Sequence, residues 1–282
     1  YELLGISKRY DYNLNADVVL IGSDEVFNYT QNDSFGYVPC LFGHGINAKR
    51  IISYAASAGY TNSDDVEHDG IRQELASGLR KMTASSVRDE NTQRLVDYCL
   101  TRLPQIVVDP TLLIEIVQFM PAYRVVKGPY LLVYAYAGRL DSPSEVRSIQ
   151  TFAREKSLKL VSVGNFHGWC NENVVVTPFE LLKVFSDATY VVTDTFHGSI
   201  FSLITSSQFV TFVRNSCPAG SNANKVLYLL GQFGLSGRIV SDISQFEKLL
   251  SAPVSFDSYH EKITDLRNSS IAFLRNSLRG LD

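Results

Sequence analysis

The sequence predicts an α/β protein with two domains, each built around a parallel β-sheet. Short β-branched and aliphatic runs recur along the chain, and stretches with helical hydrophobic spacing separate them. The chain has 282 residues, which is too long for one core of ordinary size but fits two α/β domains. A polar segment from Pro121 to Pro129 marks the boundary. We expect a first domain over 1–122, a second over 123–258, and a last helix over 259–282 that returns to the first domain.

The first half contains four strand-like runs, each followed by small or polar residues. Apolar side chains at helical spacing predict two helices, at Asp69–Lys81 and Glu90–Thr101. Asp89 and Glu90 suit the first turn of the second helix, because carboxylates stabilise a helix N-terminus. The expected strands are Asp17–Ile21, Arg50–Ala55, Thr83–Val87 and Gln105–Val108.

The second half is more regular, because strand-like runs and helical patterns alternate throughout it. The expected strands are Tyr130–Tyr136, Leu158–Val163, Val174–Val176, Thr189–Thr193, Phe209–Val213 and Arg238–Val240. The expected helices are Ser144–Lys156, Phe179–Phe185, Gly198–Ser206, Asn224–Phe233, Ser244–Leu250 and Tyr259–Leu278. This alternation predicts a second parallel sheet.

The composition is that of a globular protein that does not bind nucleic acid. Hydrophobic residues make up 45% of the chain and charged residues 20%, with a formal net charge of -3. The chain has no lysine- or arginine-rich run and no apolar stretch long enough to span a bilayer. Its cysteines (Cys40, Cys99, Cys170 and Cys217) form no CxxC pair. We therefore expect reduced thiols, no metal site and a cytoplasmic location.

The segment around His197 is the most informative part of the sequence. A β-branched run up to Thr193 predicts a buried strand, and an apolar helical pattern resumes after Asp-Thr-Phe-His-Gly. In open α/β sheets, ligands bind at the carboxyl ends of the strands, and the next helix N-terminus favours an anion. His197 at this corner can transfer protons near neutral pH. The alternative is a core histidine bonded to a backbone carbonyl.

The neighbours of His197 supply candidate ligand contacts. Gly198 lets the backbone approach a ligand, and the amides of Gly198 and Ser199 could hold phosphate or carboxylate oxygens. The Ser199 hydroxyl could do the same. Asp194 either orients the imidazole or caps the helix. Thr195 belongs to the same group of expected binding residues.

Two strand ends in the first half carry further candidates. Arg88 follows one strand, and its planar guanidinium can pair with a carboxylate or phosphate. The alternative for Arg88 is a salt bridge to Glu90 or another acid. Gly22, Ser23 and Asp24 follow the first strand, where glycine permits a tight turn and the other two present hydrogen-bonding groups. The alternative for this segment is a simple helix cap.

The remaining strand ends are less specific. Small residues around Ser57 either admit a ligand or let a helix pack closely. Asp109 and Pro110 are typical of a turn. His167 and Trp169 indicate an ordinary loop, although the indole could also stack on a sugar ring.

Taken together and in this order, five segments resemble the polysaccharide pyruvyl transferase family. The likeness covers most of the chain, from Asp17 to Val240, and the Gly-Ser-Asp and Phe-His-Gly blocks are its most specific parts. The five segments are Val19–Asn28, Ile52–Gly59, Ser86–Glu90, Val108–Leu113 and Thr193–Ser202.

The resemblance implies two Rossmann-like domains in a GT-B-like fold, with a cleft between them. It also implies transfer of pyruvate from phosphoenolpyruvate to two hydroxyls of a sugar, in a polysaccharide or its lipid-linked precursor. The essential histidine of the family falls on His197, and its strand-end arginine falls on Arg88. Asp24 is then expected to bind or activate a sugar hydroxyl. No cofactor is expected beyond the donor substrate, and peripheral association with the inner face of the membrane stays open.

Three departures from the family pattern keep alternatives open. Thr195 stands where some members have an arginine, and the usual opening glycine- and asparagine-containing segment is missing, so a first strand and helix are expected to be absent. The basic residue expected after the strand Phe209–Val213 is either Arg214 or Lys225. The alternatives are a GT-B glycosyltransferase that uses a nucleotide sugar and a non-catalytic glycan-binding relative.

Overall fold

The structure is a computed structural model that describes residues 16–31, 36–213 and 223–280, and it divides into two compact units. The N-terminal unit comprises Tyr1–Pro110 and Leu266–Asp282, and the C-terminal unit comprises Thr111–Asp265. This division falls before the proline-flanked segment that marks the boundary in the sequence. The reason is local packing, since the ring of Phe119 lies 5.6 Å from the ring of Phe179 in the C-terminal unit.

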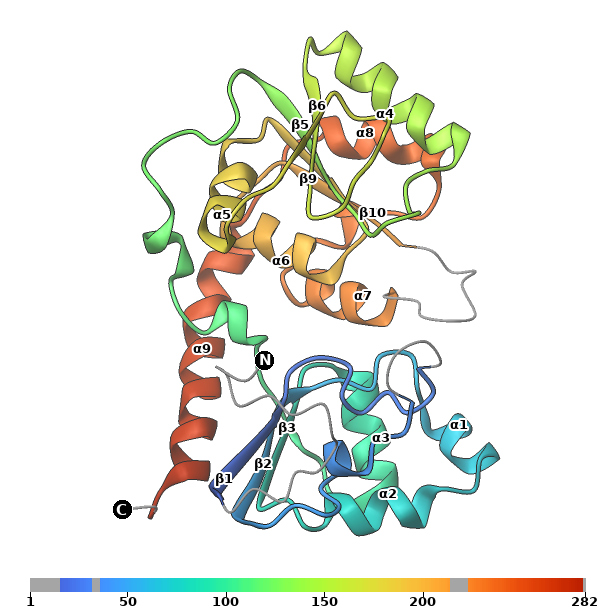
Figure 1. Ribbon diagram of the computed structural model, residues 1–282, viewed down its shortest axis with the longest axis vertical. Helices are drawn as coiled ribbons and strands as arrows, with labels where there is room; N and C mark the ends of the chain where they lie inside the picture. The colour runs from blue at the N-terminus through green and yellow to red at the C-terminus, as the bar shows by residue number, and fades with distance from the viewer. Residues whose placement is uncertain (1–15, 32–35, 214–222, 281–282) are drawn as a thin grey trace. The chain divides into compact units, whose positions relative to one another are not determined.

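The N-terminal unit contains a four-stranded parallel sheet in the order β1-β2-β3-β4 (Figure 1). Its strands are β1 (Ala16–Gly22), β2 (Ala48–Ala56), β3 (Ala84–Val87) and β4 (Gln105–Ile106). Its helices include α1 (Ser63–His68), α2 (Arg72–Leu79) and α3 (Glu90–Leu100). Asp89 caps α3, as its position before the helix suggests, by accepting a hydrogen bond from the amide of Thr92.

Helix α1 is an α-helix of this unit that the sequence patterns did not predict. Asn62 accepts hydrogen bonds from two amides of its first turn, and the Asp65 carboxylate accepts one from the amide of Asn62. This reciprocal cap stabilises a helix too short to show an apolar period. Gly70, with φ of +66°, then separates α1 from α2.

The C-terminal unit contains a six-stranded parallel sheet in the order β10-β9-β8-β5-β6-β7. Its strands are β5 (Tyr130–Tyr134), β6 (Lys159–Val163), β7 (Glu172–Val174), β8 (Tyr190–Thr193), β9 (Phe209–Phe212) and β10 (Ile239–Val240). Its helices include α4 (Pro143–Glu155), α5 (Pro178–Asp187), α6 (Phe196–Ile204), α7 (Ala223–Gln232) and α8 (Phe246–Ser251). Figure 1 shows α4 and α8 on one face of this sheet and α5, α6 and α7 on the other.

The strand order reverses between β5 and β8. From β5 the chain adds β6 and β7 on one side, and it then crosses to the other side to add β8, β9 and β10. The carboxyl ends of β5 and β8 lie side by side, with Tyr134 paired to Thr193. In doubly wound sheets, ligands bind outside the carboxyl ends at such a reversal. The topology therefore points to the loops that follow Tyr134 and Thr193.

The long helix α9 (Asp257–Leu278) contributes its second half to the N-terminal unit. There the Ser270 hydroxyl accepts a hydrogen bond from the amide of Val108 at 3.0 Å, and Arg50 donates to the carbonyl of Ser277 at 2.8 Å. The rings of Tyr54 and Phe273 lie 6.5 Å apart. These contacts tie the end of the chain to β2 and to the segment after β4.

The predicted fold class is confirmed, because both units have parallel sheets with intervening helices. The predicted strands are all present, and most of their ends lie within two residues of the predicted ones. Across the described residues, every helix is too short or too polar to cross a membrane.

Candidate functional site

The corner between β8 and α6 places His197 in the first turn of α6. Thr195 is the cap of this helix, with extended backbone angles and a side-chain oxygen that accepts a hydrogen bond from the amide of Gly198 at 2.8 Å. Of the two roles left open for Asp194, capping the helix is therefore not the one observed, since Thr195 is the cap. The residue that departs from the family pattern, Thr195, has a structural role instead.

The amides of Gly198 and Ser199 are engaged within the helix. Besides the bond from Gly198 to the Thr195 side chain, the amide of Ser199 donates to the Thr195 carbonyl at 3.2 Å. The Ser199 hydroxyl is fully buried and lies within hydrogen-bond distance of Thr195 and Thr211. These groups are therefore engaged within the protein, and their role in holding an anion stays a prediction. Gly198 is required by packing, since an added Cβ would lie 2.1 Å from the Thr193 hydroxyl.

Asp194 connects the loops after β8 and β5. One carboxylate oxygen accepts a hydrogen bond from the amide of Tyr136 at 3.1 Å, and the other lies 3.5 Å from the guanidinium of Arg139. That guanidinium also lies 4.9 Å from the centre of the Tyr136 ring. The Arg139 side chain is 32% exposed. Asp194 thus holds a partly exposed cation at the point where the strand order reverses.

Sequence reasoning missed Arg139, although the sequence carried a signal for it. Ala135, Ala137 and Gly138 lie in the segment after β5, much as Gly22 and Ser23 lie at the end of β1, and this pattern marks a strand end where a ligand can approach.

A second cation, the ammonium of Lys225, lies against Phe196, the residue before His197. The imidazole is half-buried, with its centre 5.6 Å from that of Phe196 and 6.2 Å from that of Phe201. The Lys225 ammonium lies 5.7 Å from the centre of the Phe196 ring, and this lysine of α7 is buried. The negative face of the ring favours a cation there. Arg214, the other basic candidate, lies outside the described residues.

In the N-terminal unit, the structure brings Arg88 and Asp24 together. An Arg88 nitrogen lies 3.7 Å from a carboxylate oxygen of Asp24, and another donates to Asp109 at 2.7 Å. The side chains of Arg88 and Asp109 are almost fully buried, while that of Asp24 is 80% exposed. The salt-bridge interpretation of Arg88 is therefore confirmed, with Asp109 as its main partner rather than Glu90. Asp109 is part of this group rather than only a turn residue.

Gly22 and Ser23 lie beside Asp24, at the end of β1. An added Cβ at Gly22 would lie 2.1 Å from the carbonyl oxygen of Tyr54, so glycine allows β1 to approach β2 closely. Ser23 is half-buried and Gly22 exposed.

Ser57 has a structural role in the same unit. Its hydroxyl is fully buried, donates to the Asp89 carboxylate at 2.8 Å and accepts from the amide of Gly59 at 3.1 Å. Asp89 in turn caps α3. These bonds favour the packing interpretation of Ser57, and its role in binding a substrate stays a prediction.

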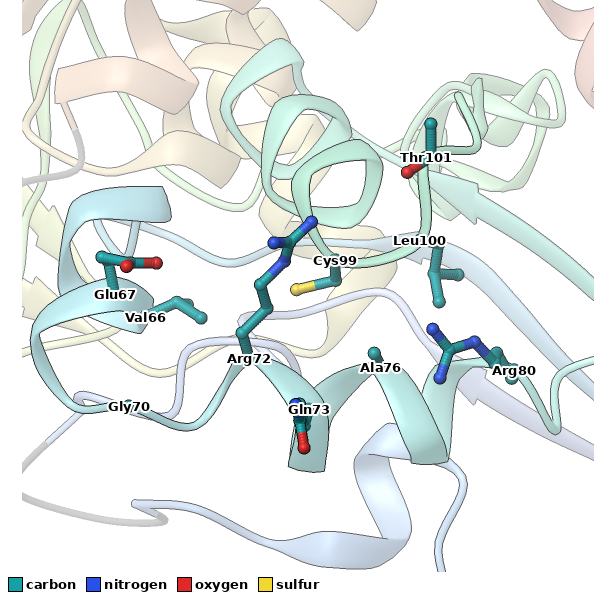
Figure 2. Close-up of a pocket in the computed structure, with 10 residues that line it drawn as sticks. All are labelled: Val66, Glu67, Gly70, Arg72, Gln73, Ala76, Arg80, Cys99, Leu100 and Thr101. Carbon is teal, nitrogen blue, oxygen red and sulfur yellow. The ribbon is translucent and has the colours of Figure 1, made fainter.

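A separate pocket of about 490 Å³ lies between α1, α2 and the end of α3, and Figure 2 shows its lining. Arg72 and Arg80 lie along α2, with Ala76 between them (Figure 2). Two nitrogens of Arg72 donate to the carbonyl of Tyr98, at 3.0 and 2.7 Å. This arginine therefore satisfies the carbonyl end of α3. None of the predicted site residues lines this pocket.

Comparison with known proteins agrees with the fold and identifies a family. A model of the polysaccharide pyruvyl transferase family matches residues 2–216. A search of curated proteins finds no match. The structure of UDP-GlcNAc 2-epimerase from Methanocaldococcus jannaschii aligns with a TM-score of 0.54 and 12% identity, covering 92% of this chain and 77% of that chain. The apo structure of OtsA aligns with a TM-score of 0.50 and 10% identity, covering 94% and 74%.

At these identities, the structural likeness concerns the fold alone. It confirms the prediction of two Rossmann-like domains of the GT-B type. The cleft between the domains stays a prediction.

Proposed function

This chain belongs to the polysaccharide pyruvyl transferase family, and we propose that it transfers the pyruvyl group of phosphoenolpyruvate to two hydroxyls of a sugar. The central carbon of the donor forms two bonds to sugar oxygens, and its bond to the phosphate oxygen breaks. Of the two hydroxyl protons, one goes to the methylene carbon and the other leaves with phosphate. The products are a cyclic ketal and inorganic phosphate.

The observation that carries this proposal is the charge at the corner between β8 and α6. Phosphoenolpyruvate is a small, highly charged anion and needs concentrated positive potential. Arg139 lies beside Asp194, and the Lys225 ammonium lies against the ring of Phe196, so two cations flank the segment Asp194–His197. The N-terminus of α6 adds its dipole to the same region. This balance supports an anionic donor at the carboxyl edge of the C-terminal sheet.

In this scheme, His197 is the general acid or base. A half-buried imidazole can give a proton to the methylene carbon or accept one from the attacking hydroxyl. The exposed Asp24 carboxylate accepts a hydrogen bond from a sugar hydroxyl, and Gly22 and Ser23 lie beside it. Arg88 acts as a positioning residue, since it is buried and lies 3.7 Å from Asp24. The scheme uses no cofactor.

Thermal stability with and without phosphoenolpyruvate tests the donor site. A ligand that binds only the folded state raises the melting temperature. We expect a rise in the wild type and about tenfold weaker binding in Arg139→Gln and in Lys225→Met, because each change removes a cation near the anion. Arg147→Gln is the matched control, since Arg147 is an exposed arginine of α4 and contacts none of the predicted site residues.

Catalysis is tested separately with His197→Ala. This variant should bind the donor but release phosphate about 10² to 10⁴ times more slowly in the presence of an acceptor sugar. If phosphoenolpyruvate raised the melting temperature of Arg139→Gln and Lys225→Met as much as that of the control Arg147→Gln, the proposed donor site would be contradicted. A shift with UDP-glucose and none with phosphoenolpyruvate would favour a glycosyltransferase. Glycan binding without any donor-induced shift or phosphate release would favour a non-catalytic relative.

A further inference from the structure

The C-terminal unit has a pocket of about 640 Å³ at the carboxyl ends of β5, β6 and β7. Its walls come from the last residues of these strands, the segments that follow them, and the start of α5. This volume is in the range of small-molecule sites. The pocket lies at the same edge of the same sheet as the corner that carries His197.

One wall of the pocket is apolar and includes a solvent-exposed aromatic ring. Phe166 lines it with 76% of its surface exposed, and the neighbouring Val175 is almost fully exposed. Exposing adjacent large apolar side chains costs free energy in water, so a patch of this kind indicates a binding surface. Gly164, with φ of +89°, turns the chain after β6 so that the following residues border the pocket.

The pocket lining has few polar side chains, and most of them already form hydrogen bonds within the protein. The side chains of Ser162 and Asn173 bond to each other, and Thr177 bonds with Glu180 at the start of α5. The side-chain nitrogen Nδ2 of Asn165 donates to the carbonyl of Ala135 at 3.0 Å. The side-chain oxygen Oδ1 of Asn165 is then able to accept a hydrogen bond. The pocket therefore suits a ring that has an apolar face and hydroxyl donors at its edge.

Tyr134 connects this pocket to the candidate active site. Its ring lines the pocket and lies 6.1 Å from the ring of Phe201, which itself lies 6.2 Å from the imidazole of His197. Its carbonyl accepts a hydrogen bond from the Thr193 hydroxyl at 2.6 Å. A molecule bound against Tyr134 is thus separated from the His197 ring by one aromatic side chain.

We propose that this pocket is a subsite for a pyranose ring of the acceptor, with Phe166 as its stacking platform. The axial C–H groups of a pyranose form an apolar face with slight positive charge, which complements the negative face of a phenyl ring. A hydroxyl at the edge of the sugar donates to the side-chain oxygen Oδ1 of Asn165. The assignment rests on the proposed function, which supplies the sugar as a substrate.

Saturation-transfer NMR with a set of methyl hexopyranosides tests the subsite. Phe166→Ala should weaken sugar binding by about tenfold, because it removes the stacking surface, and Phe166→Tyr should restore it. Phe119→Ala is the matched control, since Phe119 is a phenylalanine of the same unit with 50% exposure that does not line the pocket. The thermal shift with phosphoenolpyruvate should be the same in Phe166→Ala as in the wild type.

The outcomes separate this proposal from the proposed function. Loss of the sugar signal in Phe166→Ala alone supports the subsite. Equal signals in Phe166→Ala and Phe119→Ala overturn it, as does displacement of all sugars by a nucleotide such as UMP. Sugar binding that depends on Phe166, in a protein that phosphoenolpyruvate does not stabilise, would leave the subsite standing and remove the proposed donor.

Discussion

Each of the two parallel sheets has an arginine in a loop at its carboxyl edge, and the two arginines have different partners. In the N-terminal unit, one cation, Arg88, lies against two carboxylates, Asp109 and Asp24. In the C-terminal unit, one carboxylate, Asp194, holds Arg139, and Lys225 lies close by against Phe196. In the proposed function, the anionic donor binds at the second edge and a sugar hydroxyl binds the exposed carboxylate of the first.

The arginines at the two edges also differ in how deeply they are buried. The Arg88–Asp109 pair is almost completely enclosed, so it stabilises the loops around it. Arg139 is about one-third exposed, so it can contact a ligand without losing its bond to Asp194. Of two arginines that each follow a strand, the buried one is structural and the accessible one is available for binding.

The first prediction compares the loss of one partner from each pair. Asp109→Ala leaves the Arg88 guanidinium buried without its main carboxylate, which should lower the free energy of unfolding by about 3–5 kcal/mol. Arg139→Ala leaves Asp194 with the amide of Tyr136 and should cost about 1 kcal/mol. Urea denaturation followed by far-UV circular dichroism measures both.

Trp169 provides an internal control for this comparison. It is the only tryptophan of the chain and lies in the C-terminal unit, so its fluorescence reports on that unit. In Asp109→Ala, the circular dichroism transition should move to lower urea more than the fluorescence transition does. If Asp109→Ala and Arg139→Ala lower the free energy of unfolding by the same amount, the distinction between a structural and an accessible arginine is contradicted.

Most of the fold could be predicted from local patterns. Strands with runs such as Tyr130–Tyr134 are buried on both faces, and the sequence shows this directly as uninterrupted apolar residues. Helices α4 and α5 begin with capping boxes that are visible in the sequence, at Ser142 and Thr177. Helix α1 was not predicted, because a helix of six residues is too short to show the spacing of apolar residues that marks a helix.

The site was only partly predictable, because its pairings join residues far apart in the chain. The sequence placed His197, Arg88 and Asp24 at strand ends, but not the bond from Arg88 to Asp109, which spans 21 positions. The link from Asp194 to Tyr136 spans 58 positions. Hydroxyls such as Ser57 look the same in sequence whether they face a ligand or an internal carboxylate, so only the fold could decide their role.

The second prediction compares the glycines at the two edges. Alanine at either position places a Cβ 2.1 Å from an oxygen, which belongs to the backbone of Tyr54 for Gly22 and to the side chain of Thr193 for Gly198. Overpacking of this kind costs about 1–3 kcal/mol. Gly22→Ala should be the worse of the two, since a strand backbone yields less than a side chain. Gly237→Ala is the control, since no atom lies within 4 Å of an added Cβ there and its φ, like those of Gly22 and Gly198, is not positive.

The third prediction uses one cysteine in each unit, the buried Cys99 and the half-buried Cys170, and has the smallest effect on stability. Burial raises the pKa of Cys99 to about 11 and that of Cys170 to about 12. Because the folded pKa values are raised, their contribution to stability is complete below the unfolded value near 8.5 and falls as the pH rises above it.

Alkylation by iodoacetamide, followed by mass spectrometry, measures these thiols separately in a Cys217→Ser background. Only thiolates react, so at pH 8 both thiols should be modified much more slowly than a cysteine in a model peptide. In Asp109→Ala, opening of the N-terminal unit should accelerate labelling of Cys99 while Cys170 stays protected. Equal acceleration at both cysteines would mean that the two units open together, and the contrast between the edges would then not extend to their stability.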